Sequence, residues 1–328
     1  MLQKRWLLVG LVALAAACNN SSNNKPSSTD TANVPATPTV TAPTFDADSA
    51  YDYVAKQVAF GPRIPGTPAQ QKCADWLIAK MKSYADTVYM QKTTVTVPGG
   101  KNVPCINIIA SFNPAAKQRI LLVAHWDTRP FADEEKANPT AKIDGADDGG
   151  SGVAVAMEAA RQMKAKNPGI GVDILLNDVE DYGDTKDDNT FCLGTQYWAK
   201  NPHIPGYTAN YGIGLDMVGA KGARFFMEAV SKQYANRQMM NFWNAGNTVG
   251  FSSYFPYDDI GAGTTDDHLY VNTIAKIPTF DVIAFQSNAN FLPHWHTTKD
   301  NMDVIDKNTL KAVGQTLLQV LYVQPFNY

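Results

Sequence analysis

One stretch of the chain, Arg119 to Gly152, constrains the fold more than any other. It begins with an uninterrupted apolar run at 120–124, which is typical of a strand buried on both faces. His125 and Asp127 follow this run directly, and a long loop then leads to the sequence GADDGG at 145–150, where a helix is expected to begin. Open α/β sheets bind ligands beyond the carboxyl ends of their strands. The stretch therefore predicts the floor of an active site.

The rest of the chain alternates between helix-forming and strand-forming segments. Apolar residues at three- and four-residue steps predict helices at 47–60, 67–85, 151–166, 193–200, 232–248 and 307–323. Strands are expected at 87–97, 104–111, 120–124, 172–176, 278–285 and in a segment ending at Asp216, with a further extended segment at 224–229. The first two strands flank a Pro-Gly-Gly turn and predict a hairpin at a sheet edge. The fold class expected is α/β, a single domain with a mostly parallel twisted sheet and helices on both faces.

The N-terminal segment predicts a targeting signal rather than part of the fold. Two basic residues, an apolar run and three alanines precede Cys18, a pattern typical of a bacterial lipoprotein signal, although an ordinary secretory signal is the alternative. We expect a signal peptide at 1–17, a lipid anchor at Cys18 in the cell envelope, and a disordered tether at 18–46 that is poor in apolar residues. The catalytic domain is assigned to 47–328.

Charge and cysteine content restrict the function classes. A net charge of -3 and a pI near 5.9 give no electrostatic basis for nucleic-acid binding. Beyond Cys18, the three cysteines Cys73, Cys105 and Cys192 are an odd number. They allow either one disulfide with one free thiol or three buried thiols.

Acidic and imidazole side chains follow several of the expected strands. His125 and Asp127 follow the expected strand at 120–124, Glu180 and Asp181 follow the strand at 172–176, and Asp216 ends a third strand. Two later loops carry DDH at 266–268 and HWH at 294–296. Any one of these groups alone is more often a turn, a cap or a structural hydrogen bond. Strand ends bring them together, however, and buried like charges need a cation. A mixture of carboxylates and imidazole favours zinc.

In combination these motifs resemble a known family. The segments HWD, GADDGGSG, the acidic pair after the next strand, LDMVG and WHTTKD together resemble the zinc aminopeptidase-like fold. Within that group, VEDYGD, CLGTQYWA, TDDHLYV and FLPHWHTTKDNMD are similar to glutaminyl-peptide cyclotransferases of Bacteroidetes-type bacteria. The resemblance covers about residues 48 to 328.

The resemblance implies a role for each matching residue. It implies one zinc ion per chain, held by Asp148, Asp181 and His296; a proton shuttle, Glu180; two further acids at the site, Asp216 and Asp267; and an aromatic pocket wall, Trp295. Animal cyclases have Glu where this chain has Asp181, so the coordination by that residue can differ. Three protein ligands leave one zinc position open, as a catalytic zinc site requires.

The implied activity is an acyl transfer in which the N-terminal glutamine of a peptide or protein cyclises to pyroglutamate and releases ammonia. The main alternative is a two-zinc aminopeptidase of the same fold, in which His125 and Asp216 bind a second zinc bridged by Asp148. In the cyclase, His125 and Asp127 are supporting residues instead. An inactive binding lipoprotein is a third hypothesis, and the complete set of ligands and acids argues against it. The sequence predicts no oligomeric state.

Overall fold

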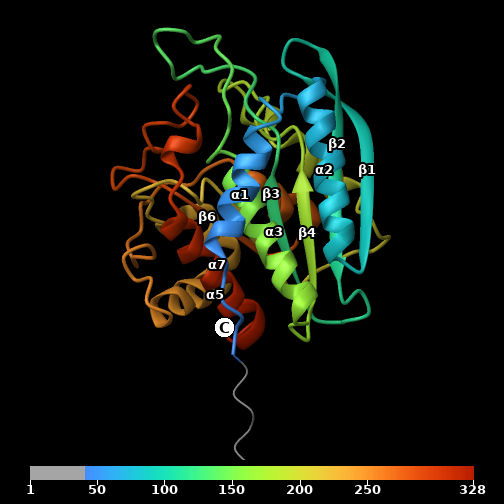
Figure 1. The fold of residues 1–328 in the computed structure, drawn as a ribbon, viewed down its shortest axis with the longest axis vertical. Coiled ribbons are helices and arrows are strands. Elements are labelled where there is room, and N and C mark those ends of the chain that lie inside the picture. The colour runs from blue at the N-terminus through green and yellow to red at the C-terminus, as the bar shows by residue number, and fades with distance from the viewer. Residues whose placement is uncertain (1–40) are drawn as a thin grey trace, which may run out of the picture. The chain divides into compact units, whose positions relative to one another are not determined.

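The computed structural model describes residues 41–328, which fold around a six-stranded sheet of order β1-β2-β4-β3-β5-β6 (Figure 1). The signal peptide, Cys18 and most of the tether expected from the sequence lie outside the described residues. The strands are β1 (Thr87–Val97), β2 (Lys101–Phe112), β3 (Arg119–His125), β4 (Gly171–Asn177), β5 (Tyr211–Asp216) and β6 (Thr279–Ile283).

The sheet combines a parallel centre with an antiparallel edge. β3 pairs in parallel with both β4 and β5, and β5 pairs in parallel with β6. β1 and β2 form the predicted hairpin, and β2 joins the parallel part by an antiparallel pairing with β4. In this register His125 lies opposite Asn177, and Asp216 lies opposite Ile283. The carboxyl ends of the four parallel strands therefore meet at one edge of the sheet.

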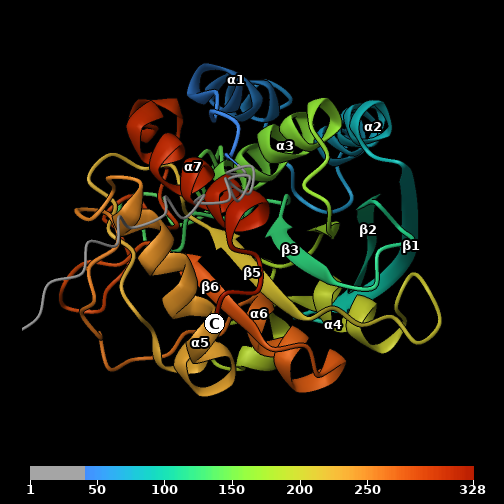
Figure 2. The same cartoon turned by 90° about the horizontal axis from the view of Figure 1, so that it is seen from below.

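Helices cover both faces of the sheet, as the sequence predicted. They are α1 (Ala47–Val58), α2 (Pro68–Tyr84), α3 (Gly150–Ala165), α4 (Leu193–Lys200), α5 (Ala229–Thr248), α6 (Asp267–Tyr270) and α7 (Lys307–Val323). Figure 2 shows α1, α2, α3 and α7 on one side of the sheet and α4 and α6 on the other, with α5 beside β6. Among residues 41–328, no helix is both long and apolar enough to cross a bilayer.

The position of β3 in the middle of the sheet explains why its sequence is continuously apolar. Ile120, Leu122 and Ala124 pack into the large core under α1, α3 and α7. Leu121 and Val123 point the opposite way, into a second core that includes Trp198 of α4. A strand covered on both faces needs apolar residues at every position.

The structure differs from the sequence expectations in short elements. Residues 224–229 form only isolated bridges, from Phe225 to Ala284 and from Met227 to Asp259, and not a strand. The single-turn helix α6 and the π-helix Val271–Ala275 that follows were not predicted. Both are too short to produce a readable apolar period. The helix expected at 232–248 begins earlier, at Ala229, because the Glu228 side chain accepts hydrogen bonds from the first turn of α5.

Ordered packing begins before residue 47, within the segment assigned to the tether. Phe45 is 2% exposed, and its backbone N–H donates to Gln315 Oε1 of α7 at 2.9 Å. Asp46 caps α1 by accepting from the N–H groups of Asp48 and Ser49. A single large aromatic side chain can anchor a polar segment that has no apolar period of its own.

The three cysteines of the described domain are free and buried. Cys73 lies on the buried face of α2, Cys105 in β2 and Cys192 just before α4. Of the two alternatives left open by the sequence, three buried thiols is the one found.

Candidate active site

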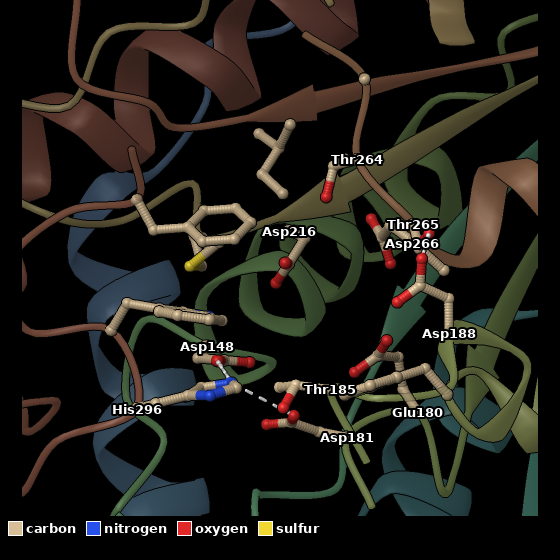
Figure 3. A pocket seen from close by; sticks show the side chains of 16 residues that line it. Asp148, Glu180, Asp181, Thr185, Asp188, Asp216, Thr264, Thr265, Asp266 and His296 are labelled. Carbon is tan, nitrogen blue, oxygen red and sulfur yellow. Dashed lines mark hydrogen bonds and ion pairs between the residues drawn. The ribbon is translucent and has the colours of Figure 1, made fainter. Parts of the chain in front are cut away.

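A cavity of about 280 Å³ lies at the carboxyl edge of the parallel strands (Figure 3). Its wall is strongly acidic and contains one imidazole, and these residues are Asp148, Glu180, Asp181, Asp188, Asp216, Asp266 and His296. An apolar side is formed by Phe191, Met217, Ile283, Phe291 and Trp295. The predicted floor of an active site is therefore a real cavity, and acids from segments far apart in the sequence converge on it.

Three of the converging residues form a ligand set. Asp148 lies in the loop before α3, Asp181 follows β4, and His296 lies in the C-terminal loop. One ligand atom from each lies within 4.8 Å of the others. His296 Nε2 is 3.2 Å from Asp181 Oδ1 and 3.6 Å from Asp148 Oδ2. The structure thus brings together the three residues that the resemblance implied as zinc ligands.

The surroundings of this ligand set fit a zinc ion. The other ring nitrogen of His296, Nδ1, lies 3.2 Å from Asp133 Oδ1, and a carboxylate on this side of the ring commonly accompanies a zinc-binding histidine. Asp181 Oδ2 is buried and has no hydrogen-bond partner among residues 41–328. Burial opposes the charged ring of His296, but Asp181, Asp133 and Asp148 outweigh it and raise its pKa to about 9. Two carboxylates and an imidazole directed at one point are a donor set that zinc accepts.

A second ligand set shares Asp148 with the first. His125, Asp148 and Asp216 also present one ligand atom each within 4.8 Å of the others. His125 Nε2 is 3.0 Å from Asp148 Oδ1 and 3.3 Å from Asp216 Oδ1. Burial opposes the charged ring of His125, but Asp127, Asp148 and Asp216 raise its pKa well above the usual value. Ligand geometry therefore allows one metal or two.

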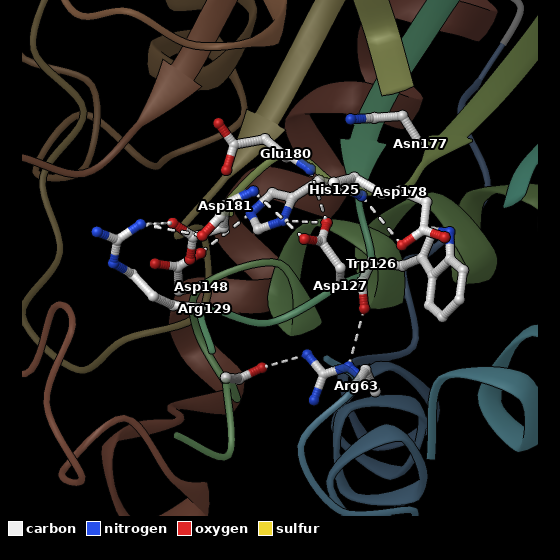
Figure 4. A network of polar contacts seen from close by, with 12 residues as sticks. Arg63, His125, Trp126, Asp127, Arg129, Asp148, Asn177, Asp178, Glu180 and Asp181 are labelled. Atoms are coloured by element: carbon white, nitrogen blue, oxygen red, sulfur yellow. Dashed lines mark hydrogen bonds and ion pairs between the residues drawn. The ribbon is translucent and has the colours of Figure 1, made fainter. Parts of the chain in front are cut away.

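Asp127 connects the end of β3 to the acidic pair after β4 (Figure 4). It is fully buried, and its carboxylate accepts from the backbone N–H of Glu180 at 3.0 Å and from that of Asp181 at 3.3 Å. His125 Nδ1 lies 3.5 Å from the same carboxylate. Asp127 therefore holds the backbone that carries both acids, a role consistent with the supporting position predicted for it.

The glycine-rich acidic loop is fixed by two buried charged residues. Arg63 donates to the carbonyls of Trp126, Asp144 and Gly145 at 2.9, 2.5 and 2.7 Å, so it ties the end of β3 to this loop (Figure 4). Asp300 accepts from the backbone N–H groups of Asp147 and Asp148 at 2.7 and 3.1 Å. Asp300 follows the WHT motif, so the segment carrying His296 also orients Asp148.

A glycine is required where this loop enters α3. Gly149 has φ +76, and a Cβ atom there would lie 2.8 Å from His125 Cε1 and 2.9 Å from the carbonyl oxygen of Asp127. Any side chain would displace the residues at the end of β3. The glycines after the acidic pair therefore allow Asp148 and His125 to approach each other.

Glu180 and Asp216 are acids of the cavity whose surroundings favour the protonated form. Burial is the largest cause for both, and it raises each pKa well above its ordinary value. Neighbouring carboxylates raise the pKa further, while His125 opposes the shift in both cases. A carboxyl group with a raised pKa can exchange a proton near neutral pH, which general acid–base catalysis requires.

In the DDH segment the structure places Asp266, rather than Asp267, on the cavity wall. Asp267 lies behind Asp266 and accepts a hydrogen bond from Asn177 Nδ2 at 2.6 Å. The contact of Asp216 is with His125. Burial and the neighbouring Asp266 raise the pKa of Asp267 to about 7. Sequence reasoning missed Asp266 because two adjacent acids cannot be told apart without the backbone direction, which here is set by Asp266 acting as the N-cap of α6.

Trp295 forms part of the cavity wall, as the resemblance implied. Its ring stacks on His296 with centroids 3.7 Å apart and lies 4.4 Å from Phe291. His296 itself has φ +54, a left-handed conformation that is uncommon for a residue other than glycine. Met217 of the cavity wall shares this conformation with φ of 47, as do Val179 and Cys192 next to Glu180 with φ of 55 and 54. Such backbone strain concentrates at functional sites.

Solved structures of similar proteins align over nearly their whole length. A Zn-dependent exopeptidase from Parabacteroides distasonis is 47% identical with a TM-score of 0.84, over 86% of this chain and 99% of that one. Glutaminyl cyclase from Bacteroides thetaiotaomicron is 43% identical with a TM-score of 0.84, over 86% and 99%. Glutaminyl cyclase from Porphyromonas gingivalis is 48% identical with a TM-score of 0.83, over 85% and 99%. No curated protein sequence matches significantly.

The family is established by a sequence profile as well as by these structures. The profile of peptidase family M28 matches residues 107–321, a range that begins in β2 and ends in α7. The matched range contains both ligand sets, Glu180 and the aromatic wall of the cavity. The chain belongs to peptidase family M28.

Proposed function

We propose that this protein is a glutaminyl-peptide cyclotransferase that converts the N-terminal glutamine of peptides or proteins to pyroglutamate and releases ammonia. The observation that carries the proposal is the cavity itself, in which the Asp148–Asp181–His296 set, Glu180 and Asp216 surround a space of about 280 Å³. A space of this volume suits one amino-acid side chain with its amine. The glutaminyl cyclases at 43% and 48% identity support the same activity.

The metal proposed is one zinc ion per chain, bound by Asp148, Asp181 and His296. Bound there, zinc would polarise the side-chain carbonyl of the substrate glutamine. Asp133 would keep the His296 ring oriented, and Arg129 would steady Asp181, since its Nη1 lies 3.3 Å from Asp181 Oδ1. His125 would remain a hydrogen-bonding partner of Asp148 and Asp216.

The chain's own residues supply the proton transfers. The glutamine α-amine forms a new C–N bond to its own side-chain carbonyl carbon, and the bond from that carbon to the amide nitrogen breaks. Glu180 would accept a proton from the attacking amine and return it to the departing nitrogen, which leaves as ammonia. Asp216 and Asp266 would hold the amine, and Trp295 would pack against the side chain. Because the substrate supplies the nucleophile, no activated water is needed.

Ammonia release from a glutamine-initiated peptide tests the proposal. The protein should release one ammonia per peptide and leave a blocked N-terminus. An asparagine-initiated peptide is the matched control, because its side chain is one carbon shorter and would have to close a strained four-membered ring. Glu180→Gln should abolish turnover and retain zinc. Free glutamine instead of ammonia would refute the cyclase and identify a peptidase.

The second candidate is a two-zinc aminopeptidase, favoured by one specific observation. The second ligand set, His125–Asp148–Asp216, is complete and buried. If it held a zinc ion, Glu180 would activate water for hydrolysis of the N-terminal residue. Metal analysis separates the two candidates, because the cyclase proposed here contains one zinc per chain and the peptidase two.

We also propose that a lipid on Cys18 anchors the enzyme in the cell envelope. The support is the sequence pattern before Cys18, a basic start, a short apolar run and three alanines. Cys18→Ala should release the protein from membranes into the soluble fraction. Unchanged partitioning of that variant would contradict lipidation.

A further inference from the structure

We propose that Cys192 is a positioning residue for Glu180, holding the carboxyl group of Glu180 in place through its thiol. The inference rests on the proposed function, because that function makes Glu180 the proton shuttle. Cys192 is fully buried and belongs to neither the Asp148–Asp181–His296 set nor the His125–Asp148–Asp216 set, and its sulfur lies within 4.8 Å of carboxylate oxygens of Glu180 and Asp266. Its hydrogen bonds to Glu180 indicate the positioning role.

The side chains and backbones of the two residues are joined directly. The Cys192 thiol donates to Glu180 Oε1, with Sγ and Oε1 3.1 Å apart. The backbone N–H of Cys192 donates to the carbonyl of Glu180 at 2.8 Å, and that of Leu193 donates to Val179 at 2.9 Å. The segment before α4 is thus fixed to the acidic pair, and the thiol extends this contact to the carboxyl group.

The backbone at this contact is strained on both sides. Val179 and Cys192 have φ of 55 and 54, and glycine would adopt this conformation at lower cost. A residue other than glycine at such a position indicates that contacts of its side chain offset the cost of the backbone conformation. At residue 192 the side chain ends on Glu180.

The chemical state of the thiol suits a hydrogen-bond donor and not a nucleophile. Burial raises the pKa of Cys192 well above its ordinary value, and the carboxylates of Glu180, Asp267 and Asp266 raise it further. The sulfur therefore keeps its proton. A bond to Oε1 restricts the rotation of a flexible glutamate side chain and leaves the other oxygen for the substrate.

The test compares two variants of Cys192 with a matched control. Cys192→Ala should lower kcat roughly tenfold with KM and zinc content unchanged, because the proton shuttle is less well oriented while substrate and metal still bind. Cys192→Ser keeps a donor and should recover most of the lost kcat. Cys73→Ala, which removes another fully buried thiol that does not line the cavity, should leave kcat unchanged.

A spectroscopic measurement tests the contact without catalysis. The infrared S–H stretching band of Cys192, identified by its absence in Cys192→Ser, should move to higher wavenumber in Glu180→Ala because the acceptor is lost. A band that does not move, wild-type kcat in Cys192→Ala, or a serine variant as slow as the alanine variant would each overturn the inference. A wild-type protein that releases no ammonia would refute the proposed function instead.

Discussion

Replacing Asp127 with asparagine should reduce activity more than the small change in side-chain shape suggests. The Asp127 carboxylate accepts from the backbone N–H groups of both Glu180 and Asp181. Asparagine has nearly the same shape but offers one acceptor oxygen, so its NH₂ group faces one of these N–H donors. One charged hydrogen bond is lost and one buried donor is left without a partner. The acidic pair must then move.

The size of the effect follows from that lost bond. A hydrogen bond to a charged group contributes about 1.5–3 kcal/mol, and we expect the free energy of unfolding to fall by about this amount. If the same loss appears in the transition state, kcat/KM falls roughly 10- to 150-fold. Denaturant unfolding measures the first quantity, and ammonia release from a glutamine-initiated peptide measures the second.

Asp173 provides the control for this experiment. It is buried and accepts from Arg119 Nε at 2.6 Å, but it lies near the opposite end of β4 from the cavity. Asp173→Asn should therefore destabilise the fold by a similar amount and leave kcat/KM unchanged. Equal losses of kcat/KM in the two variants, or none in Asp127→Asn, would refute the role assigned to Asp127.

Four further predictions concern the cation and the cavity wall. Because a proton must leave His296 before Nε2 can bind zinc, chelator competition should show zinc affinity rising about tenfold per pH unit up to about pH 9; a pH-independent affinity would contradict this. The charged His296 ring stabilises the metal-free fold below pH 6.5, and thermal melts should show that contribution disappearing as the pH rises through about 9. His125→Ala should retain one zinc per chain by metal analysis, whereas a fall from two to one would identify the peptidase. Trp295→Ala should raise KM roughly tenfold at constant zinc content, because the substrate loses its largest apolar contact; an unchanged KM would remove Trp295 from the binding site.

Local sequence patterns were sufficient for the framework of the fold. The run at 120–124 is apolar at every position because cores lie on both sides of β3, and the turn at 98–100 closes a hairpin between adjacent segments. The position of His125 at the end of β3 also followed from the sequence. Apolar periodicity and turn-forming residues determine structure over a few neighbouring positions. The strand, the hairpin and the position of His125 depend only on such local patterns.

Features that depend on tertiary contacts could not be predicted in this way. Arg63 is fully buried because it binds three carbonyl oxygens of segments far along the chain, and no local pattern indicates such a role. The choice of Asp266 over Asp267 depends on the direction of the first turn of α6. Left-handed residues such as Cys192 carry no sequence signal, because the surrounding contacts impose the strain.

The ligands alone do not determine which reaction this scaffold supports, since Asp148 belongs to both possible metal sets. A peptidase must direct Glu180 at a water molecule, whereas the proposed cyclase must direct it at the amine of the substrate. The direction of Glu180 is therefore the property that separates the two reactions. Asp127 fixes its backbone and the Cys192 thiol fixes its carboxyl group, and neither residue is a ligand of the proposed zinc ion. It follows that the specificity of this active site for cyclisation should depend on residues around Glu180 at least as strongly as on those that bind the metal.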